Sequence, residues 1–334
     1  MTPDIQILDT RPVRLGRHPA TRYRLRRDVP YTGDAELDLS FSTFDAVVLA
    51  PDRAGAPVVT LMNGITRDMT RSVPAAIALS EAGIGAVLLD TPLGGIRRPT
   101  RGHPGEDLAE LARRGLQPDL AFVGRVFDGV AADLPAVLAL AADVHGLTGP
   151  RALFGVSFGC VLSSLAFARD GVGERLLGVI GHPDLGGMSR GLMDGFARFS
   201  GLPPTLVATG LRLGPVAESA ARRYGGDAAV GGLRFARLLQ RLSRGGPALD
   251  AVDPLSFAGR VSPDRPARFL AGERDPVAPP EAVGQAAARF ATHAVEVAPG
   301  LGHGWYPAAR PASARPFPDL CADWLLRHLA DWAA

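Results

Sequence analysis

Short runs of apolar residues, each ending in polar or turn-forming residues, recur along most of the chain. Runs of this kind are typical of strands that are buried on both faces of a sheet. Six of them lie at Pro57–Met62, Ala86–Asp90, Arg151–Val156, Leu176–Ile180, Ala267–Ala271 and Ala294–Val297. Two earlier runs, Arg22–Arg26 and Ala46–Ala50, are predicted to add antiparallel strands at one edge of the same sheet.

Stretches with helical periodicity separate these runs. They lie at Ser72–Glu81, Leu120–Val144, Phe158–Arg169 and Leu320–Ala330. The second stretch repeats apolar residues at a spacing close to the helical period, and Pro135 is expected to kink it or divide it. Because strands alternate with helices in this way, the sequence predicts a mostly parallel central sheet with helices on both faces.

The alternation breaks off in one region of the second half of the chain. Two amphipathic segments there, Gly191–Phe199 and Leu233–Leu242, are separated by glycines and prolines. We therefore predict an α/β core formed by residues 1–184 and 253–334, with a helical cap insertion at residues 185–252. Ligands of open α/β sheets bind outside the carboxyl ends of the strands, so an insertion that leaves the sheet there would cover the site.

The composition supports one large domain with an insertion, since a chain of 334 residues with 46% hydrophobic content can bury a substantial core. The chain has 36 arginines and no lysine. They are scattered among acidic residues and the net charge is only +2, so we expect no nucleic-acid partner. The two cysteines, Cys160 and Cys321, cannot form a disulfide framework or a cysteine-based metal site.

The sequence predicts neither a secreted protein nor a membrane span. Met1–Arg14 carries charges of both signs and lacks the apolar core of a signal peptide. The most apolar helical stretch, Ala131–Val144, is interrupted by Asp133 and Asp143. We therefore expect a cytoplasmic location. The sequence leaves a homo-oligomer open.

The strongest local signal for chemistry is Gly155-Val156-Ser157-Phe158-Gly159, which lies between a predicted strand and a predicted helix. A G-x-S-x-G motif in this strand–turn–helix context is typical of a nucleophilic serine. The flanking glycines permit a sharp turn that exposes the hydroxyl and aims the following amide at a developing oxyanion. An ordinary glycine-rich turn would also explain these five residues, so the interpretation depends on the rest of the pattern.

A serine hydroxyl needs a base within hydrogen-bond reach, and the base needs a carboxylate that orients it. Among seven histidines, His303 is the best placed, because it follows the last predicted strand in a loop with glycines on either side. Asp275 is the preferred acid, since it follows the strand Ala267–Ala271 in a turn. The stretch between Asp275 and His303 is long enough for one helix and the last strand.

Asp184 is the alternative acid, because it follows the strand Leu176–Ile180. A carboxylate there would also reach the edge of the sheet. Its neighbours Gly186 and Gly187 equally suit a hinge into the insertion. The sequence therefore prefers Asp275 without excluding Asp184.

A tetrahedral intermediate also needs hydrogen-bond donors for its oxyanion. The amide of Phe158, directly after the serine, is the first predicted donor. The second is predicted at the backbone N–H of Ile65, because the strand Pro57–Met62 runs into Asn63-Gly64, where glycine permits a close approach of the backbone. Considered alone, Asn-Gly is more often a simple turn.

Together, the serine elbow, the acid turn and the histidine loop resemble the α/β-hydrolase superfamily over nearly the whole chain, with its chain order of Ser, Asp, His. Shorter stretches, Val252–Ala258 and Asp90–Pro99, are similar to dienelactone-hydrolase-like and acetyl-xylan-esterase-like branches. The chain departs from the common pattern at Asn63, where many members have histidine. The nucleophile also differs from the cysteine of the dienelactone hydrolases.

This resemblance implies an α/β-hydrolase fold and a serine hydrolase that cleaves a small-molecule carboxylic ester through an acyl-enzyme. An acyltransferase or a peptidase with the same triad, and a non-catalytic ligand-binding homologue, are the alternatives. The chain has no H-E-x-x-H, Walker or dinucleotide-binding glycine motif, so we expect neither a metal nor an organic cofactor. The natural substrate is left open.

Overall fold

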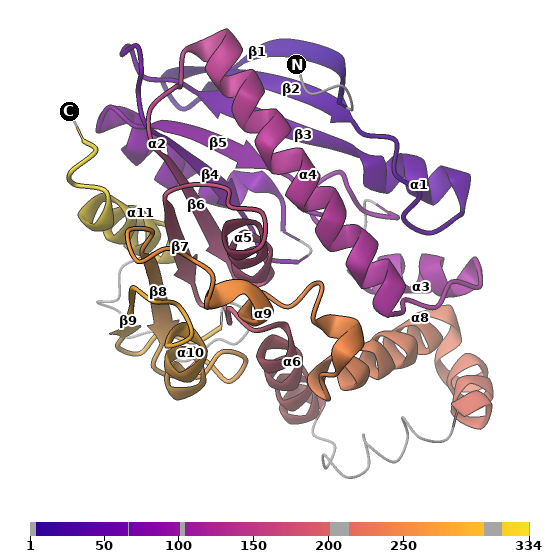
Figure 1. The fold of residues 1–334 in the computed structure, drawn as a ribbon. Helices are drawn as coiled ribbons and strands as arrows, with labels where there is room; N and C mark the ends of the chain where they lie inside the picture. The colour runs from indigo at the N-terminus through magenta and orange to yellow at the C-terminus, as the bar shows by residue number, and fades with distance from the viewer. Residues whose placement is uncertain (1–4, 66, 101–103, 201–213, 304–315, 334) are drawn as a thin grey trace.

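The computed structural model describes residues 5–65, 67–100, 104–200, 214–303 and 316–333. Within these ranges, nine strands form one sheet in the order β1-β2-β3-β5-β4-β6-β7-β8-β9 (Figure 1). The strands are β1 (Gln6–Leu15), β2 (His18–Arg26), β3 (Thr43–Leu49), β4 (Val58–Met62), β5 (Gly85–Leu89), β6 (Arg151–Val156), β7 (Arg175–Val179), β8 (Ala267–Gly272) and β9 (His293–Ala298). Strands β4 to β9 run parallel, whereas β1, β2 and β3 join through antiparallel pairs. The predicted mostly parallel sheet is confirmed.

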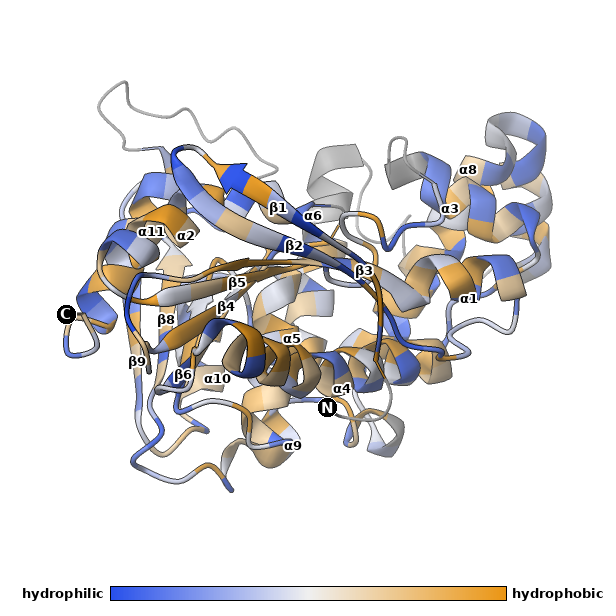
Figure 2. Ribbon diagram, turned by 90° about the horizontal axis from the view of Figure 1, so that it is seen from above, coloured by the Kyte–Doolittle hydropathy of each residue, from blue (hydrophilic) through white to orange (hydrophobic). Residues whose placement is uncertain are grey.

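Helices cover both faces of the sheet. One face packs against α4 (Leu120–His145), α5 (Phe158–Ala168) and α10 (Pro280–Ala287), and the other against α2 (Val73–Glu81) and α11 (Phe317–His328). The other helices are α1 (Ala35–Ser42), α3 (Pro104–Arg113), α6 (Leu185–Ser200), α8 (Gly214–Ser243) and α9 (Leu255–Ala258). Strands β4 and β5 are buried at every residue and are coloured as hydrophobic in Figure 2, as expected of strands covered on both faces.

The register of the central strands brings their carboxyl ends to one edge of the sheet. Met62, the last residue of β4, pairs with Leu89 of β5 and with Gly155 of β6. Side chains that follow these strands therefore emerge side by side, at the edge where open α/β sheets bind ligands. The residues directly after β4, β5 and β6 are Asn63, Asp90 and Ser157.

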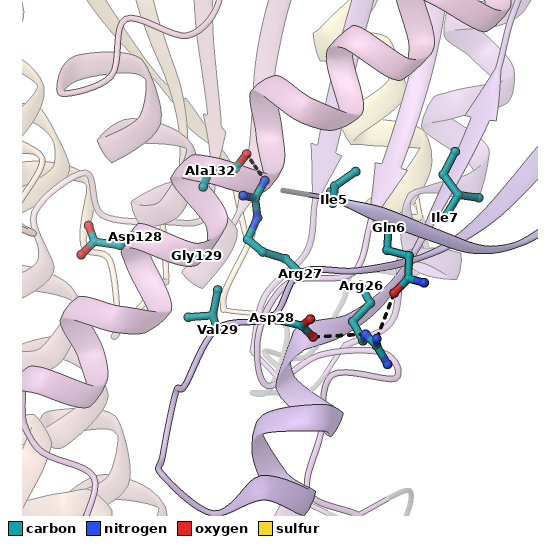
Figure 3. A pocket seen from close by; sticks show the side chains of 10 residues that line it. All are labelled: Ile5, Gln6, Ile7, Arg26, Arg27, Asp28, Val29, Asp128, Gly129 and Ala132. Atoms are coloured by element: carbon teal, nitrogen blue, oxygen red, sulfur yellow. Dashed lines mark hydrogen bonds and ion pairs between the residues drawn. The ribbon is translucent and has the colours of Figure 1, made fainter. Parts of the chain in front are cut away.

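Helix α4 is continuous through Pro135, so of the two expected outcomes, a kink or a division, the division does not occur. A proline removes one backbone donor and its ring disturbs the preceding turn of the helix. In the turn that precedes the proline, Arg27 Nη2 donates to the carbonyl oxygen of Ala132 at 2.8 Å (Figure 3). A hydrogen bond from outside the helix thus accompanies the proline.

A buried ionic cluster joins α4 to the loop after β5. Asp133 accepts hydrogen bonds from Arg27 Nε at 2.8 Å and from Arg97 Nη1 at 2.7 Å. Arg97 also donates to the carbonyl oxygen of Phe41 at 2.7 Å and to the hydroxyl of Tyr31 at 2.9 Å. The side chains of Arg97 and Asp133 are fully buried, which charged groups tolerate only when they are paired and hydrogen-bonded. The cluster therefore fixes the loop that follows β5.

The described part of the segment between β7 and β8 contains the helices α6, α8 and α9, and α6 and α8 lie at one end of the molecule (Figure 1). Helix α8 packs closely on α3, since a Cβ at Gly231 would overlap the carbonyl oxygen of Leu108. Helix α6 begins at Leu185, so Gly186 and Gly187 lie in its first turn and not in an extended hinge. Across the described ranges, no helix is both long and apolar enough to cross a bilayer.

Candidate active site

The turn between β6 and α5 places Ser157 in a strained backbone conformation, with φ 55° and ψ −117°. A residue other than glycine rarely has a positive φ, and such strain is concentrated at functional sites. Close backbone contacts require both neighbouring glycines. A Cβ at Gly155 would lie 2.5 Å from the backbone nitrogen of Cys160, and a Cβ at Gly159 would lie 2.8 Å from the carbonyl oxygen of Asn63. The local geometry is the sharp turn that the motif predicts.

Ser157, His303 and Asp275 form a continuous hydrogen-bonded chain. Ser157 Oγ lies 2.9 Å from His303 Nε2, and His303 Nδ1 lies 2.9 Å from Oδ2 and 3.1 Å from Oδ1 of Asp275. A carboxylate only accepts hydrogen bonds, so Nδ1 carries the imidazole proton and Nε2 accepts from the serine hydroxyl. The exposed fractions of Ser157, His303 and Asp275 are 8%, 1% and 3%. The structure thus brings together three residues that are far apart in the sequence.

The turn after β8 holds Asp275 through its own backbone. Oδ1 of Asp275 accepts hydrogen bonds from the N–H groups of Val277 at 2.8 Å and of Ala278 at 3.0 Å. This turn is also tied to the histidine loop, since the N–H of Arg274 donates to the carbonyl oxygen of Leu301 at 2.9 Å. The carboxylate is therefore fixed in front of the imidazole, which is what an orienting acid requires.

Asp184, the alternative acid, lies at the start of α6 and has other partners. Its Oδ1 accepts a hydrogen bond from the N–H of Gly186 at 2.8 Å, and its Oδ2 accepts one from Arg190 Nη2 at 3.3 Å. A short polar side chain in this position satisfies the free N–H groups of a helix start. Asp184 therefore caps α6, and the carboxylate that contacts His303 is that of Asp275.

The turn after β4 lies directly against the serine. A Cβ at Gly64 would lie 3.1 Å from Ser157 Cβ and 3.5 Å from Ser157 Oγ, so glycine allows this close approach. Ile65 follows Gly64 in the turn and is partly buried. Phe158 is the first residue of α5, where backbone N–H groups have no partner within the helix. Both residues predicted as oxyanion donors thus belong to turns that adjoin Ser157.

The side chain of Asn63 is buried and uses its amide inside the same turn. Nδ2 donates to the carbonyl oxygen of Asp68 at 3.1 Å, and Oδ1 accepts from Ser72 Oγ at 3.0 Å. Thr91 Oγ1 donates to the carbonyl oxygen of Asn63 at 3.4 Å, which links the turn to the loop after β5. The residue at which the sequence departs from the common pattern is therefore an anchor of the turn that contains Ile65.

No protein-family model matches the chain, and no curated protein matches it by sequence. Solved structures do match. An esterase from an Arctic intertidal metagenomic library has a TM-score of 0.52 at 14% identity, over 97% of this chain and 98% of that chain. An esterase from Pyrococcus furiosus has a TM-score of 0.53 at 14% identity, over 87% of both chains. A puromycin-hydrolyzing peptidase from Mycobacterium tuberculosis has a TM-score of 0.52 at 18% identity, over 97% of this chain and 39% of that chain. This chain has the α/β-hydrolase fold.

Sequence reasoning missed a buried carboxyl group at the same edge of this α/β-hydrolase sheet. Asp90 directly follows β5 and is 2% exposed. Its Oδ2 accepts a hydrogen bond from the N–H of Ile96 at 3.2 Å, while its Oδ1 has no partner among the described residues. Burial raises the pKa of Asp90 to about 7. The sequence signal for this group was an aspartate at the end of a buried strand, followed closely by Gly94-Gly95. In the structure the second glycine lies against the carboxyl group, since a Cβ at Gly95 would overlap it.

His182 is a second buried imidazole, in the loop that follows β7. Its Nδ1 accepts a hydrogen bond from the N–H of Asp184 at 3.1 Å. A Cβ at Gly187 would lie 2.6 Å from His182 Nε2, so the ring packs against the first turn of α6. Burial lowers the pKa of His182, which favours the neutral imidazole.

A pocket of about 870 Å³ lies elsewhere in the molecule, between the end of β2 and α4 (Figure 3). Its lining includes Ile5, Arg26 and Asp128, and none of the three residues of the hydrogen-bonded chain. Arg26 is already paired there, with Gln6 at 2.9 Å and Asp28 at 3.2 Å. Among the residues that the structure describes, no cluster of three or more His, Cys, Asp or Glu side chains is arranged to hold a metal ion.

Proposed function

We propose that this α/β-hydrolase is a serine hydrolase that cleaves small carboxylic esters through an acyl-enzyme. In this proposal Ser157 is the nucleophile, His303 the general base and Asp275 the acid that orients the base. The main support is the continuous hydrogen-bonded chain from Ser157 Oγ through the imidazole to the Asp275 carboxylate, with 2.9 Å at both links. Two solved structures with this fold are esterases, which fits the reaction.

The first half of the reaction acylates the enzyme. Ser157 Oγ attacks the carbonyl carbon of the ester while its proton passes to Nε2 of His303. The backbone N–H groups of Phe158 and Ile65 donate to the negatively charged oxygen of the tetrahedral intermediate. When this intermediate collapses, the bond to the alcohol oxygen breaks, and the imidazolium gives its proton to the leaving alcohol. Asp275 stabilises the imidazolium throughout.

The second half releases the acid. Water attacks the acyl-serine and gives a proton to His303, and the second intermediate returns the Ser157 oxygen as the leaving group, which regains that proton. The free energy of the transition state is lowered by residues of the chain itself, so the proposed reaction uses no cofactor. Because catalysis proceeds through these groups as a unit, loss of any one of them removes most of the rate.

The proposed cap is the insertion at residues 185–252, with α6 leaving the sheet just after β7. Leu192 and Met193 on α6 are partly buried and pack against the apolar core on one side. In this proposal apolar residues of the cap also face the bound substrate, where they would favour an uncharged acyl or alcohol group. We therefore propose an uncharged small-molecule ester as the substrate.

The test is a panel of p-nitrophenyl esters, thioesters and aminoacyl amides, measured with the parent protein and with Ser157→Ala. Ester turnover that exceeds amide turnover, and that falls by several orders of magnitude in Ser157→Ala, is expected. Preferential amide turnover would favour a peptidase, and transfer of the acyl group to an added alcohol in preference to water would favour an acyltransferase. Absence of any turnover would favour a ligand-binding homologue.

A further inference from the structure

Helix α6 of the insertion touches the backbone of the turn that holds the proposed acid. A Cβ at Gly191 would overlap the carbonyl oxygen of Val277 and would lie 2.5 Å from its carbonyl carbon and 2.8 Å from its Cα. Both residues are buried. Only a residue without a side chain fits between this helix and this turn, because a backbone carbonyl cannot move aside as a flexible side chain can.

The residue that α6 contacts is one that holds the proposed acid. The N–H of Val277 donates to Oδ1 of Asp275 at 2.8 Å, while its carbonyl group faces Gly191. The other oxygen of the same carboxylate, Oδ2, lies 2.9 Å from His303 Nδ1. A displacement of Val277 therefore moves one of the donors that set the orientation of the carboxylate in front of the imidazole.

The start of α6 is fixed at the same time to the core and to α8. Asp184 caps the helix at Gly186, and Arg190 spans two segments, with Nη2 3.3 Å from Asp184 Oδ2 and Nη1 donating to the carbonyl oxygen of Ser243 at 3.0 Å. Ser243 is the last residue of α8. Arg190 thus joins the start of α6 both to Asp184 and to the end of α8.

We propose that α6 is a positioning element for Asp275. The packing of α6 on the core then sets the geometry of the triad through the contact between Gly191 and Val277. The proposal rests on the proposed function of Asp275 as the orienting acid. It gives α6 a positioning role in catalysis, in addition to any role of the insertion as a cover for the substrate. Ligands or substitutions that shift α6 should change the reactivity of Ser157 from outside the site.

Three glycine-to-alanine variants in the insertion test the contact. Gly191→Ala adds a methyl group against the acid turn, and Gly231→Ala adds one that would overlap a backbone carbonyl at the contact between α8 and α3. Gly232→Ala adds one beside it where no atom lies within 4 Å. The readouts are the rate of labelling by a fluorophosphonate probe, kcat and KM for a p-nitrophenyl ester that the parent hydrolyses, and the thermal midpoint.

Gly191→Ala should slow labelling and lower kcat by about tenfold to a hundredfold with little change in KM, because a misplacement of about 1 Å near catalytic groups has effects of this size. Gly231→Ala should lower the thermal midpoint but leave the labelling rate within about threefold of the parent, and Gly232→Ala should change neither. Equal labelling rates for Gly191→Ala and Gly232→Ala would overturn the proposal. An equally large loss in Gly231→Ala would also overturn it, by showing a general effect of loosened packing.

A double-mutant cycle with Asp275→Asn separates positioning from stability. If α6 acts through Asp275, Gly191→Ala should slow labelling by less than about twofold once the carboxylate has been replaced, with labelling followed over hours. The same factor in both backgrounds would contradict the proposed route. If Gly191→Ala does not fold, Arg190→Gln, at a half-exposed residue, is the substitute, because it weakens the contacts that hold the start of α6. It should slow labelling several-fold in the protein that retains Asp275, and not in Asp275→Asn. A parent protein that the probe never labels would contradict the proposed function, whereas a labelled parent with an unaffected Gly191→Ala contradicts only the role of α6.

Discussion

The two candidate acids differ in what their carboxylates contact, and this difference predicts unequal effects. Asp275→Asn should lower kcat by about 10⁴-fold, as in serine proteases, because an amide can favour the wrong imidazole tautomer and cannot stabilise the imidazolium. Asp184→Asn should change kcat by less than about tenfold, because asparagine also caps helices well. Steady-state kinetics of both folded variants test the ranking. The reverse order would move the acid to Asp184 and leave Ser157 and His303 in place.

The buried Asp90 carboxyl group predicts a pH-dependent stability. Burial raises its pKa from 3.8 to about 7, so between these values the folded state holds a proton that the unfolded state has released. The free energy of unfolding should therefore fall as pH rises from about 4 to about 7. Asp90→Asn cannot ionise and should raise the stability at pH 8 much more than at pH 4.

Urea unfolding at the two pH values measures this difference. Asp52→Asn, at an exposed position, is the matched control, and its stability should follow that of the parent at both values. If Asp90→Asn also follows the parent, the buried carboxyl group is not the source of the pH dependence.

Some residues of the candidate site could be selected from the sequence, because their positions relative to neighbouring strands and helices identify them. Ser157 lies in a motif that needs a strand before it and a helix after it, and His303 follows the last strand, so both could be selected from one sequence. The choice between Asp275 and Asp184 depended on hydrogen bonds between distant segments, which a sequence does not contain. The contact between Gly191 and Val277 was not predictable for the same reason.

At the scale of helices and strands, the buried ionic cluster that holds α4 leads to a stability prediction. Asp133→Ala should lower the free energy of unfolding by about 3–5 kcal/mol, because it removes the carboxylate that balances the buried charges of Arg27 and Arg97. Asp128→Ala on the same helix is the control, since Asp128 forms an exposed pair with Arg169 and should contribute less than about 1 kcal/mol. Chemical denaturation of both variants provides the comparison. Similar losses in both would show that the cluster does not anchor α4.

The elements that were predicted correctly are those whose side chains are buried in a regular pattern. The parallel strands match because apolar runs that pack on both faces are visible in one sequence. Strand β1 was missed because most of its side chains are exposed, so its pairing with β2 leaves no apolar pattern. Helix α1 was missed although Asp34 caps it by accepting from the N–H groups of Glu36 and Leu37. Its eight residues are too few for helical periodicity to be recognised.

At the scale of the whole molecule, the sequence predicted the layers but not how the insertion sits on them. The break in the strand and helix alternation was enough to expect a helical segment between β7 and β8. Arg190 joins α6 to the end of α8, and α8 packs on α3, which lies outside the predicted insertion. Contacts of this kind join segments that are far apart in the chain, and periodicity does not reveal them.

The proposed activation of Ser157, at the turn after β6, can be tested without a known substrate. The intact protein is incubated with a fluorophosphonate probe, and the labelled peptide is identified by mass spectrometry, with Ser157→Ala as the control. We predict one modification, on Ser157, that is absent from the variant although the variant unfolds at about the same temperature, because the exchanged hydroxyl contributes little packing. Modification of a different residue, or equal labelling of Ser157→Ala, would contradict the account.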